Sequence, residues 1–177
     1  MSMNSQAKAA LSKTIRFLRH RLIERLGHSL FSTYRLHIAD IDKAGLTQKH
    51  YENRKRLLKA ISKDKEFERR HPISSTVFHK EDFLDLLKRA AYTHINRHVY
   101  IRLLEGFGLR KKFLSGGWSA KRYQDLVFFL PTLRNDETEG YAFFLELIFN
   151  ELATDLPGLF GKSTIDLIPL FPADLRM

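Results

Sequence analysis

Apolar and polar residues follow one another along this chain with the period of an α-helix. The clearest stretch is residues 80–109, KEDFLDLLKRAAYTHINRHVYIRLLEGFGL, where apolar residues recur every three or four positions. That spacing is typical of a helix with a buried face. Gly106 and Gly108 supply a stop. About 25 helical residues at ~1.5 Å each would cross a small domain. We therefore expect a central buried helix against which the others pack.

Two long basic helices are predicted before it, over about residues 5–70. The first, within residues 1–40, carries an apolar stripe at spacings of three and four, close to the seam of a coiled coil. Thr47 is placed to cap the second helix, which runs to about Arg70. Pro72 ends it, because the residue before a proline disfavours helical backbone angles. The stripe of the first helix consists of Leu11, Ile15, Leu18, Leu22, Leu26 and Leu30.

Core helices are expected over about residues 79–155, followed by an irregular end at 156–177. Ser119 suits the N-cap of a helix that reaches Leu130, and Pro131 ends it. The next helix, from about residue 136 or 138 to Thr154, is apolar nearly all round, which implies deep burial. No period-two strand stands out. The pattern predicts an all-α fold, a multi-helix bundle forming one domain over 1–177.

Charge is distributed unevenly along the chain. Residues 1–135 hold 28 Lys and Arg against 12 Asp and Glu, whereas residues 136–177 hold 2 against 8. Such asymmetry suggests a basic surface that faces a polyanion, although basic helical faces are often only solvated surface. The apolar runs are far shorter than the roughly 20 residues that span a bilayer, and no signal peptide is visible. The chain has no cysteine. We expect a cytoplasmic protein without a membrane partner.

Motifs of known chemistry are not evident. His94 and His98 have the spacing of helical zinc ligands, but Ile95 stands where a metalloprotease needs glutamate, and no third ligand is signposted. Core or surface histidines explain them better, so we predict no metal site. No phosphate-binding loop and no dinucleotide loop occurs either. We predict no catalytic residues in this chain.

Trp118 and the Asn96–Arg97 pair each have both a structural and a functional explanation. Trp118 lies among Lys and Arg and would either stack on a nucleic-acid base or hold its loop on the core, and we favour the core. Asn96 and Arg97 lie mid-helix, where polar groups are costly unless they are hydrogen-bonded. We expect a buried structural role, with Arg97 paired to Glu105 or to an acidic residue of the 136–151 region, rather than a phosphate contact.

The string AAYTHINRHVYIRLLEGFGL resembles a helix near the start of adenine-specific DNA methyltransferases of the BREX and type IIG restriction-modification kind. The matching form is AAYT-x-x-NR-x-x-x-x-R-x-x-E-x-x-G-L. The start NSQAKAALSKTIRFLRHRLIERL and the stretches GLRKKFLSGGWSAKRYQDL and NDETEGYAFFLELIFNELATDLPGLFG are similar to neighbouring parts of these enzymes, most convincingly over residues 90–171.

This resemblance implies an N-terminal helical domain of a larger enzyme. In that family the catalytic domain that follows binds S-adenosylmethionine and receives the flipped adenine at an NPP[YF] motif. Neither that motif nor the glycine-rich cofactor loop occurs here, so this chain is expected to be non-catalytic and to hold no cofactor of its own. The implied partners are DNA and the methyltransferase catalytic domain in cis.

We therefore expect a domain that contacts the DNA backbone through its basic half and braces the catalytic domain through its C-terminal end. An alternative is a protein–protein interaction module for other phage-defence subunits, with the first helix pairing through its leucine stripe. Structural roles are assigned to Asn96, Arg97, Glu105 and Trp118. The candidate DNA-binding residues are Lys13, Arg16, Arg19, Arg54, Arg56, Lys111, Lys112, Lys121 and Arg122.

Overall fold

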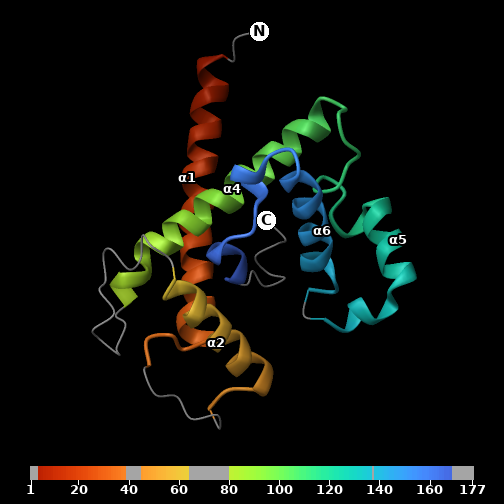
Figure 1. Cartoon of the computed structure of the whole chain (residues 1–177). Coiled ribbons are helices and arrows are strands. Elements are labelled where there is room, and N and C mark those ends of the chain that lie inside the picture. The colour runs from red at the N-terminus through yellow and green to blue at the C-terminus, as the bar shows by residue number, and fades with distance from the viewer. Residues whose placement is uncertain (1–3, 39–44, 64–79, 137, 169–177) are drawn as a thin grey trace. The chain divides into compact units, whose positions relative to one another are not determined.

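The computed structural model describes residues 4–38, 45–63, 80–136 and 138–168 (Figure 1). All regular secondary structure in these ranges is helical, which confirms the predicted all-α class. The chain divides into two compact units. Unit 1 consists of Met1–Tyr92 and Lys162–Pro169, and unit 2 of Thr93–Gly161 and Leu170–Met177. The expectation of a single domain over the whole chain stays a prediction.

The first helix of unit 1, α1 (Ser5–His28), continues into one π-helical turn, Ser29–Thr33. The helix therefore ends earlier than the sequence pattern suggested. Arg35 adopts a positive φ of 48°, a left-handed backbone conformation that an α-helix does not continue through. The amide of Leu36 instead donates to the carbonyl of Leu30, at 3.0 Å.

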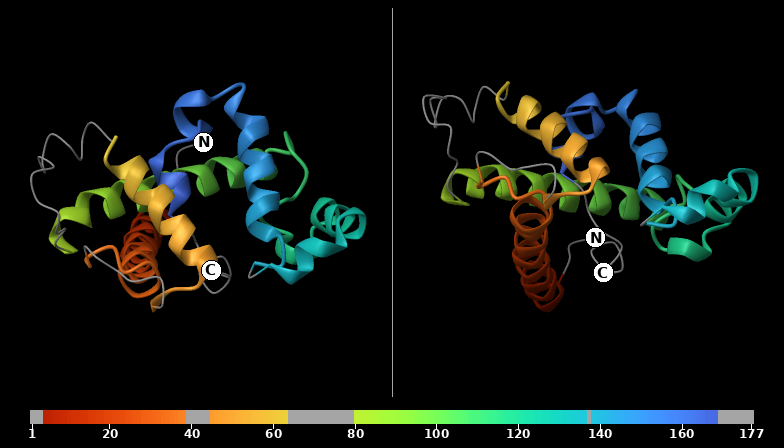
Figure 2. Two further views of the ribbon diagram at one scale, coloured as in Figure 1. Left: turned by 60° about the horizontal axis from the view of Figure 1, so that its bottom comes forward. Right: turned by 90° about the horizontal axis from the view of Figure 1, so that it is seen from below.

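The second helix of unit 1, α2 (Gln48–Ile61), begins where it was expected to begin. The side chain of Thr47 accepts a hydrogen bond from the amide of His50 at 3.2 Å, which confirms Thr47 as the N-cap. The predicted continuation to Arg70 and the stop at Pro72 lie outside the described residues. α2 packs beside a 3₁₀ turn, Thr164–Leu167, near the other end of the chain (Figure 2).

The core of unit 1 forms where the leucine stripe of α1 reaches the other elements. Leu22 and Leu26 are the buried residues of α1, and Leu30 follows in the π-helical turn. Phe31 in that turn meets Phe83 edge to face, with ring centroids 5.5 Å apart. The remaining fully buried side chains of this core include Leu36, Leu57, Ile61, Leu86, Ala90 and Ala91.

The central helix, α4 (Leu84–Gly106), follows a 3₁₀ turn, Lys80–Phe83, and contributes residues to both units. Its end has the hydrogen bonds of a Schellman motif. The amide of Leu109 donates to the carbonyl of Leu104 at 2.9 Å, and that of Gly108 to the carbonyl of Glu105 at 3.2 Å. Gly108 has a φ of 70°, so the predicted glycine stop is confirmed.

Unit 2 is built around α6 (Tyr141–Ala153), accompanied by α5 (Lys121–Phe129), a 3₁₀ turn Pro131–Asn135 and the short α7 (Pro157–Phe160). Five residues of α6 are buried, but Phe143 and Leu147 are exposed, so the deep burial predicted from its nearly continuous apolar sequence holds for one face only. The buried residues share the core with Ile101 of α4, Tyr123 and Val127 of α5, and Phe160 of α7.

The helix starts in unit 2 differ from the prediction. The N-cap of α5 is Ala120, whose side chain has no acceptor, and not Ser119, which ends the 3₁₀ turn Gly117–Ser119. α6 begins after Gly140, whose φ is 79°. A Cβ at Gly140 would lie 2.7 Å from the Cβ of Leu133, so glycine fits both the backbone angle and the space.

Candidate nucleic-acid interface

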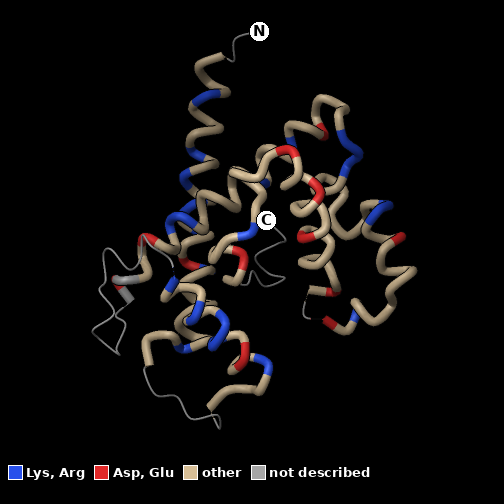
Figure 3. Tube along the Cα trace, in the orientation of Figure 1, with Lys and Arg blue, Asp and Glu red and all other residues tan. Residues whose placement is uncertain are grey.

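The first element of the candidate interface is α1, which carries six Lys and Arg residues against one Glu. Lys13 and Arg16 are exposed, and the guanidinium of Arg16 donates to the Ser12 hydroxyl at 3.2 Å within the same helix. Basic residues recur along α1 in Figure 3. The single acidic residue, Glu24, lies 3.3 Å from His20. The helix therefore presents positive charge to solvent along its length.

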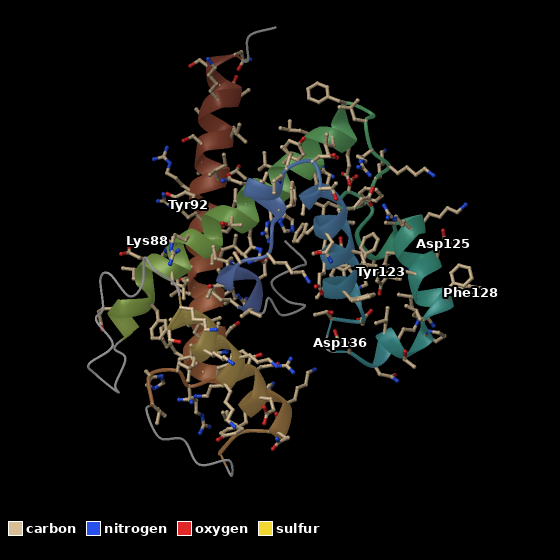
Figure 4. All side chains as sticks on the ribbon, viewed as in Figure 1. Lys88, Tyr92, Tyr123, Asp125, Phe128 and Asp136 are labelled. Carbon is tan, nitrogen blue, oxygen red and sulfur yellow. The ribbon has the colours of Figure 1, made fainter. Side chains whose placement is uncertain are left out.

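Arg19 is held in place more firmly than its neighbours. It is half-buried, and its guanidinium donates to the hydroxyl of Tyr92 on α4 at 2.7 Å. The same guanidinium lies 5.7 Å from the centre of the Tyr92 ring, a cation–π contact. Figure 4 labels Tyr92 beside α1. The structure therefore gives Arg19 a fixed orientation that sequence analysis did not anticipate.

Two arginines of α2 were both predicted to contact DNA, and the structure separates them. Arg56 is exposed. Arg54 is 7% exposed, and its guanidinium donates to the backbone carbonyls of Tyr34, at 3.1 Å, and Ile38. The prediction that Arg54 contacts DNA is wrong, because its donors face inward and fasten the segment after α1 to α2.

The basic cluster of unit 2 lies in the loop after α4 and in the first turn of α5. Lys111, Lys112 and Lys121 are exposed. Arg122, another predicted DNA contact, instead donates to the carboxylate of Glu151 on α6 at 3.0 Å, and Arg110 binds the other oxygen of the same carboxylate. These hydrogen bonds, first of all the one from Arg110, lower the pKa of Glu151 below its usual range. Partial burial of the carboxylate acts in the opposite direction but is outweighed.

Glu105 anchors the loop that carries these cations. Its side chain is 4% exposed. One carboxylate oxygen accepts the amides of Phe113 and Leu114, at 2.5 and 2.6 Å, and the other accepts the hydroxyl and the amide of Ser115, at 2.6 and 3.2 Å. Burial alone would raise the pKa of Glu105, but the hydrogen bonds from Ser115 and from the three amides outweigh it and lower the pKa. The predicted structural role of Glu105 is confirmed.

Trp118 of the loop and Tyr123 of α5 turn toward the core, whereas Phe128 and Phe129 at the end of α5 are exposed. Trp118 stacks on Tyr141 of α6, with ring centroids 4.2 Å apart and planes 14° from parallel. Tyr123 is buried and donates its hydroxyl hydrogen to the carbonyl of Glu139 at 2.7 Å. Burial, followed by the charge of Glu105, raises the pKa of Tyr141 to about 12. Trp118 therefore holds its loop on the core, as we favoured.

The Asn96–Arg97 pair behaves only in part as predicted. Asn96 is exposed, so its assignment as a buried structural residue is wrong. Arg97 is 1% exposed and structural, and it donates to the backbone carbonyls of Leu159 at 2.8 Å and Gly161 at 3.1 Å. Its guanidinium also lies 5.0 Å from the Phe149 ring centre. Arg97 is therefore buried and hydrogen-bonded, as expected of a structural residue.

The two histidines of α4 are packed against protein. The ring of His98 meets Phe149 edge to face at 6.4 Å, and its Nδ1 lies 2.7 Å from the carbonyl of His94. Burial lowers the pKa of His98, the bond to His94 opposes this, and the charge of Arg97 lowers the pKa further. Among the described residues, no three His, Cys, Asp or Glu side chains gather as metal ligands would.

Sequence reasoning missed one group in each unit that holds basic side chains in place. In unit 2 this group is Glu151, a glutamate on an almost wholly apolar helix, which was a signal that basic partners lie nearby. Tyr92 gave no such signal, because its contact with Arg19 joins residues 73 positions apart.

Comparisons of the chain with models of protein families, with curated proteins and with solved structures found no match. The described helices include none with both the length and the apolar character needed to cross a bilayer.

Proposed function

We propose that this protein is a non-catalytic helical domain that binds the phosphate backbone of DNA, mainly through α1 and the exposed part of α2. The observation that carries the proposal is the charge of α1, six Lys and Arg against one Glu, on a helix whose buried residues begin only at Leu22. Exposed cations release counterions from DNA when they meet its phosphates.

Unit 2 offers a second, smaller set of contacts. Lys111, Lys112 and Lys121 are exposed beside a loop that Glu105 fixes in place. Arg122 contributes less than these lysines, because Glu151 neutralises part of its charge. Phosphate contacts of this kind give affinity without sequence choice.

We propose further that the domain belongs to a larger enzyme. Because its helices resemble those of the family named above, that enzyme would be an adenine-specific DNA methyltransferase of a restriction-modification or phage-defence system of the BREX or type IIG kind. In this proposal the S-adenosylmethionine site and the methyl transfer belong to a catalytic domain in cis, which this domain braces. A cytoplasmic location belongs to the same proposal. What supports it is the order of the helical motifs together with the basic surface.

The test is the binding of the chain to a fluorescent DNA duplex of arbitrary sequence across a salt series. If about five phosphates are contacted, log affinity falls with log salt with a slope of about −4 to −5. Lys13→Glu combined with Arg16→Glu is expected to weaken binding more than tenfold and to reduce the slope by about two units. Both positions are exposed in the interior of α1 and glutamate is a good helix former, so this variant is expected to keep α1 folded.

The matched control is Lys88→Glu combined with Arg134→Glu, which changes the net charge equally at exposed positions outside α1 and α2. Its affinity should stay within about threefold of the original protein, because neither side chain is among the proposed phosphate contacts. Equal losses in the two variants would show that net charge alone attracts DNA and that α1 is not the contact surface. No binding at low salt would overturn the proposal.

A further inference from the structure

The apolar stripe of α1 continues past the point where the core of unit 1 covers it. Leu22 and Leu26 are buried, whereas Ile15 and Leu18 are half-buried and Leu11 is 48% exposed. No residue of α1 before Leu22 is buried. The apolar stripe is therefore continuous, but only its C-terminal part is buried in the core, and its N-terminal part is accessible to solvent.

Such a face is unusual for a helix of this kind. A helical segment of about 15 residues is only marginally stable in water unless its apolar side packs on something. The part of α1 before Leu22 is of that length and is held mainly by its continuation into the core. A partner that extended the same seam would both cover the stripe and stabilise the segment.

The charges of α1 fall into two sets around this stripe. At 3.6 residues per turn, Lys13, Arg16 and His20 lie on the side of the helix opposite the stripe. Glu24 lies on that side too, where it pairs with His20. The stripe itself is flanked by Lys8, Arg19 and Arg21. The face proposed above to meet DNA phosphates, led by Lys13 and Arg16, is therefore not the stripe face.

A second copy of the chain is a poor occupant for the stripe. Two α1 helices packed seam to seam would bring the basic flanks of both copies together, with Arg19 and Arg21 along each edge. The only carboxylate of α1, Glu24, faces away from the seam. Like charges at the flanking positions of a paired helix oppose association.

A lipid surface also fits poorly. A helix that lies on a membrane separates a broad apolar face from a polar one. On α1 the stripe is narrow, and Phe17, which is 57% exposed, lies among the cations away from the stripe, where Arg21 contacts its ring. A narrow stripe with basic edges matches the seam of a helix pair whose other member carries acidic edges.

We propose that the N-terminal half of α1 pairs with an acidic amphipathic helix of a partner protein, which packs apolar residues on Leu11, Ile15 and Leu18 and places carboxylates beside Arg19 and Arg21. The DNA contact is led by Lys13 and Arg16 on the opposite side of α1, and the two contacts share only the flanking cations. Lys13→Glu combined with Arg16→Glu therefore tests the DNA contact, and Leu11→Gln tests the stripe. Arg19 is already oriented for it by the hydroxyl of Tyr92.

The probe is a fluorescein-labelled peptide of about three heptads with leucine at the a and d positions and glutamate at e and g. Glutamate at these positions prevents the peptide from pairing with itself. Binding to the full chain is measured by fluorescence anisotropy. A peptide with the same leucines and lysine at e and g, and an acidic peptide of scrambled order, serve as comparisons. The acidic amphipathic peptide is expected to bind at least tenfold more tightly than either.

Two variants separate the stripe from general charge attraction. Leu11→Gln is expected to weaken binding of the acidic amphipathic peptide at least tenfold. Phe17→Gln removes another exposed apolar side chain away from the stripe and should weaken binding clearly less, its remaining effect coming from the lost contact with Arg21. Both sites are exposed, so neither variant disturbs the core, and circular dichroism verifies that their helix content is equal.

Equal effects of the two variants, or equal binding of the ordered and scrambled acidic peptides, would overturn the proposal. So would a doubling of molar mass in light scattering that Leu11→Gln abolishes, because the occupant would then be a second copy. Binding to phosphatidylserine vesicles that Leu11→Gln abolishes, without peptide binding, would assign the stripe to a membrane instead.

Discussion

The two units handle positive charge in opposite ways. In unit 1, α1 displays six Lys and Arg residues against one Glu, and the glutamate pairs with a histidine. In unit 2, carboxylates organise the basic loop: Glu105 binds its backbone, and Glu151 binds Arg110 and Arg122. Figure 3 shows acidic residues on both α4 and α6 of unit 2.

The difference teaches that a basic sequence is not by itself a binding surface. A cation that holds the fold together has little left for a ligand, because its donors already face protein acceptors. By this criterion α1 is the stronger candidate for contact with a polyanion, and the loop of unit 2 is a structural element that happens to carry a few exposed lysines. The following predictions test this contrast, beginning with the largest effect.

Glu105→Ala should give the largest loss of stability. It leaves the amides of Phe113, Leu114 and Ser115 without their acceptor in a mostly buried site. We expect a loss of about 3–5 kcal/mol in the free energy of unfolding, measured by urea denaturation, and faster hydrogen exchange of these three amides. Asp125→Ala, at an exposed position of α5 labelled in Figure 4, should change stability by less than about 0.5 kcal/mol.

Arg54→Met and Arg56→Met should separate structure from binding within α2. Replacing Arg54 removes its hydrogen bonds to the carbonyls of Tyr34 and Ile38, and we expect unit 1 to lose about 2 kcal/mol. Replacing Arg56 should leave stability within about 0.5 kcal/mol and weaken DNA binding. If Arg56→Met destabilised the protein as much as Arg54→Met, the assignment of a structural role to Arg54 alone would be wrong.

Acidification should weaken unit 2. The pKa of Glu105 is lowered from 4.5 in the native state, so its stabilising contribution is present above pH 4.5 and is lost as pH falls through the native pKa. The pKa of His98 is lowered from 6.5, so the unfolded chain takes up that proton first and stability begins to fall below pH 6.5.

Urea denaturation at a series of pH values between about 7.5 and about 3.5 checks this prediction. The free energy of unfolding should decrease as the pH is lowered. In His98→Gln the decline should begin only in the range where carboxylates titrate. A His98→Gln protein that still lost stability around pH 6 would assign the first phase to another group.

Arg122→Gln should give the smallest effect. The pair with Glu151 is partly exposed, with 48% and 37% of the two side chains accessible, and Arg110 still binds the same carboxylate. We expect a loss of about 0.5–1 kcal/mol that disappears in high salt. A loss as large as that of Glu105→Ala would mean that the carboxylate of Glu151, rather than that of Glu105, dominates the loop.

Periodicity and capping signals predicted the class and most of the helices correctly. The Thr47 cap, the glycine stop after α4 and the burial of one face of α6 all follow from local sequence. Ser119 failed as a cap because the chain makes a separate 3₁₀ turn there, so the N-cap is Ala120 and α5 starts one residue later than predicted. Local chemistry favours a cap, but the tertiary position of the loop decides which residue occupies it.

Individual side chains were harder to predict than elements. Arg54 and Arg56 have the same chemistry, and only the carbonyls of Tyr34 and Ile38, up to 20 positions earlier, decide that Arg54 turns inward. Arg97 likewise finds its acceptors 62 and 64 positions later. A backbone carbonyl carries no residue-type signature, so sequence reasoning could not name these acceptors.

The stacking of Trp118 on Tyr141 gives the protein a built-in optical probe. The chain has one tryptophan, and its indole lies against the aromatic core of unit 2. Fluorescence excited at the red edge of the absorption band, where tyrosine is dark, therefore comes from unit 2 alone. A ligand that binds the basic loop would alter the colour or intensity of that emission, because Trp118 lies in that loop.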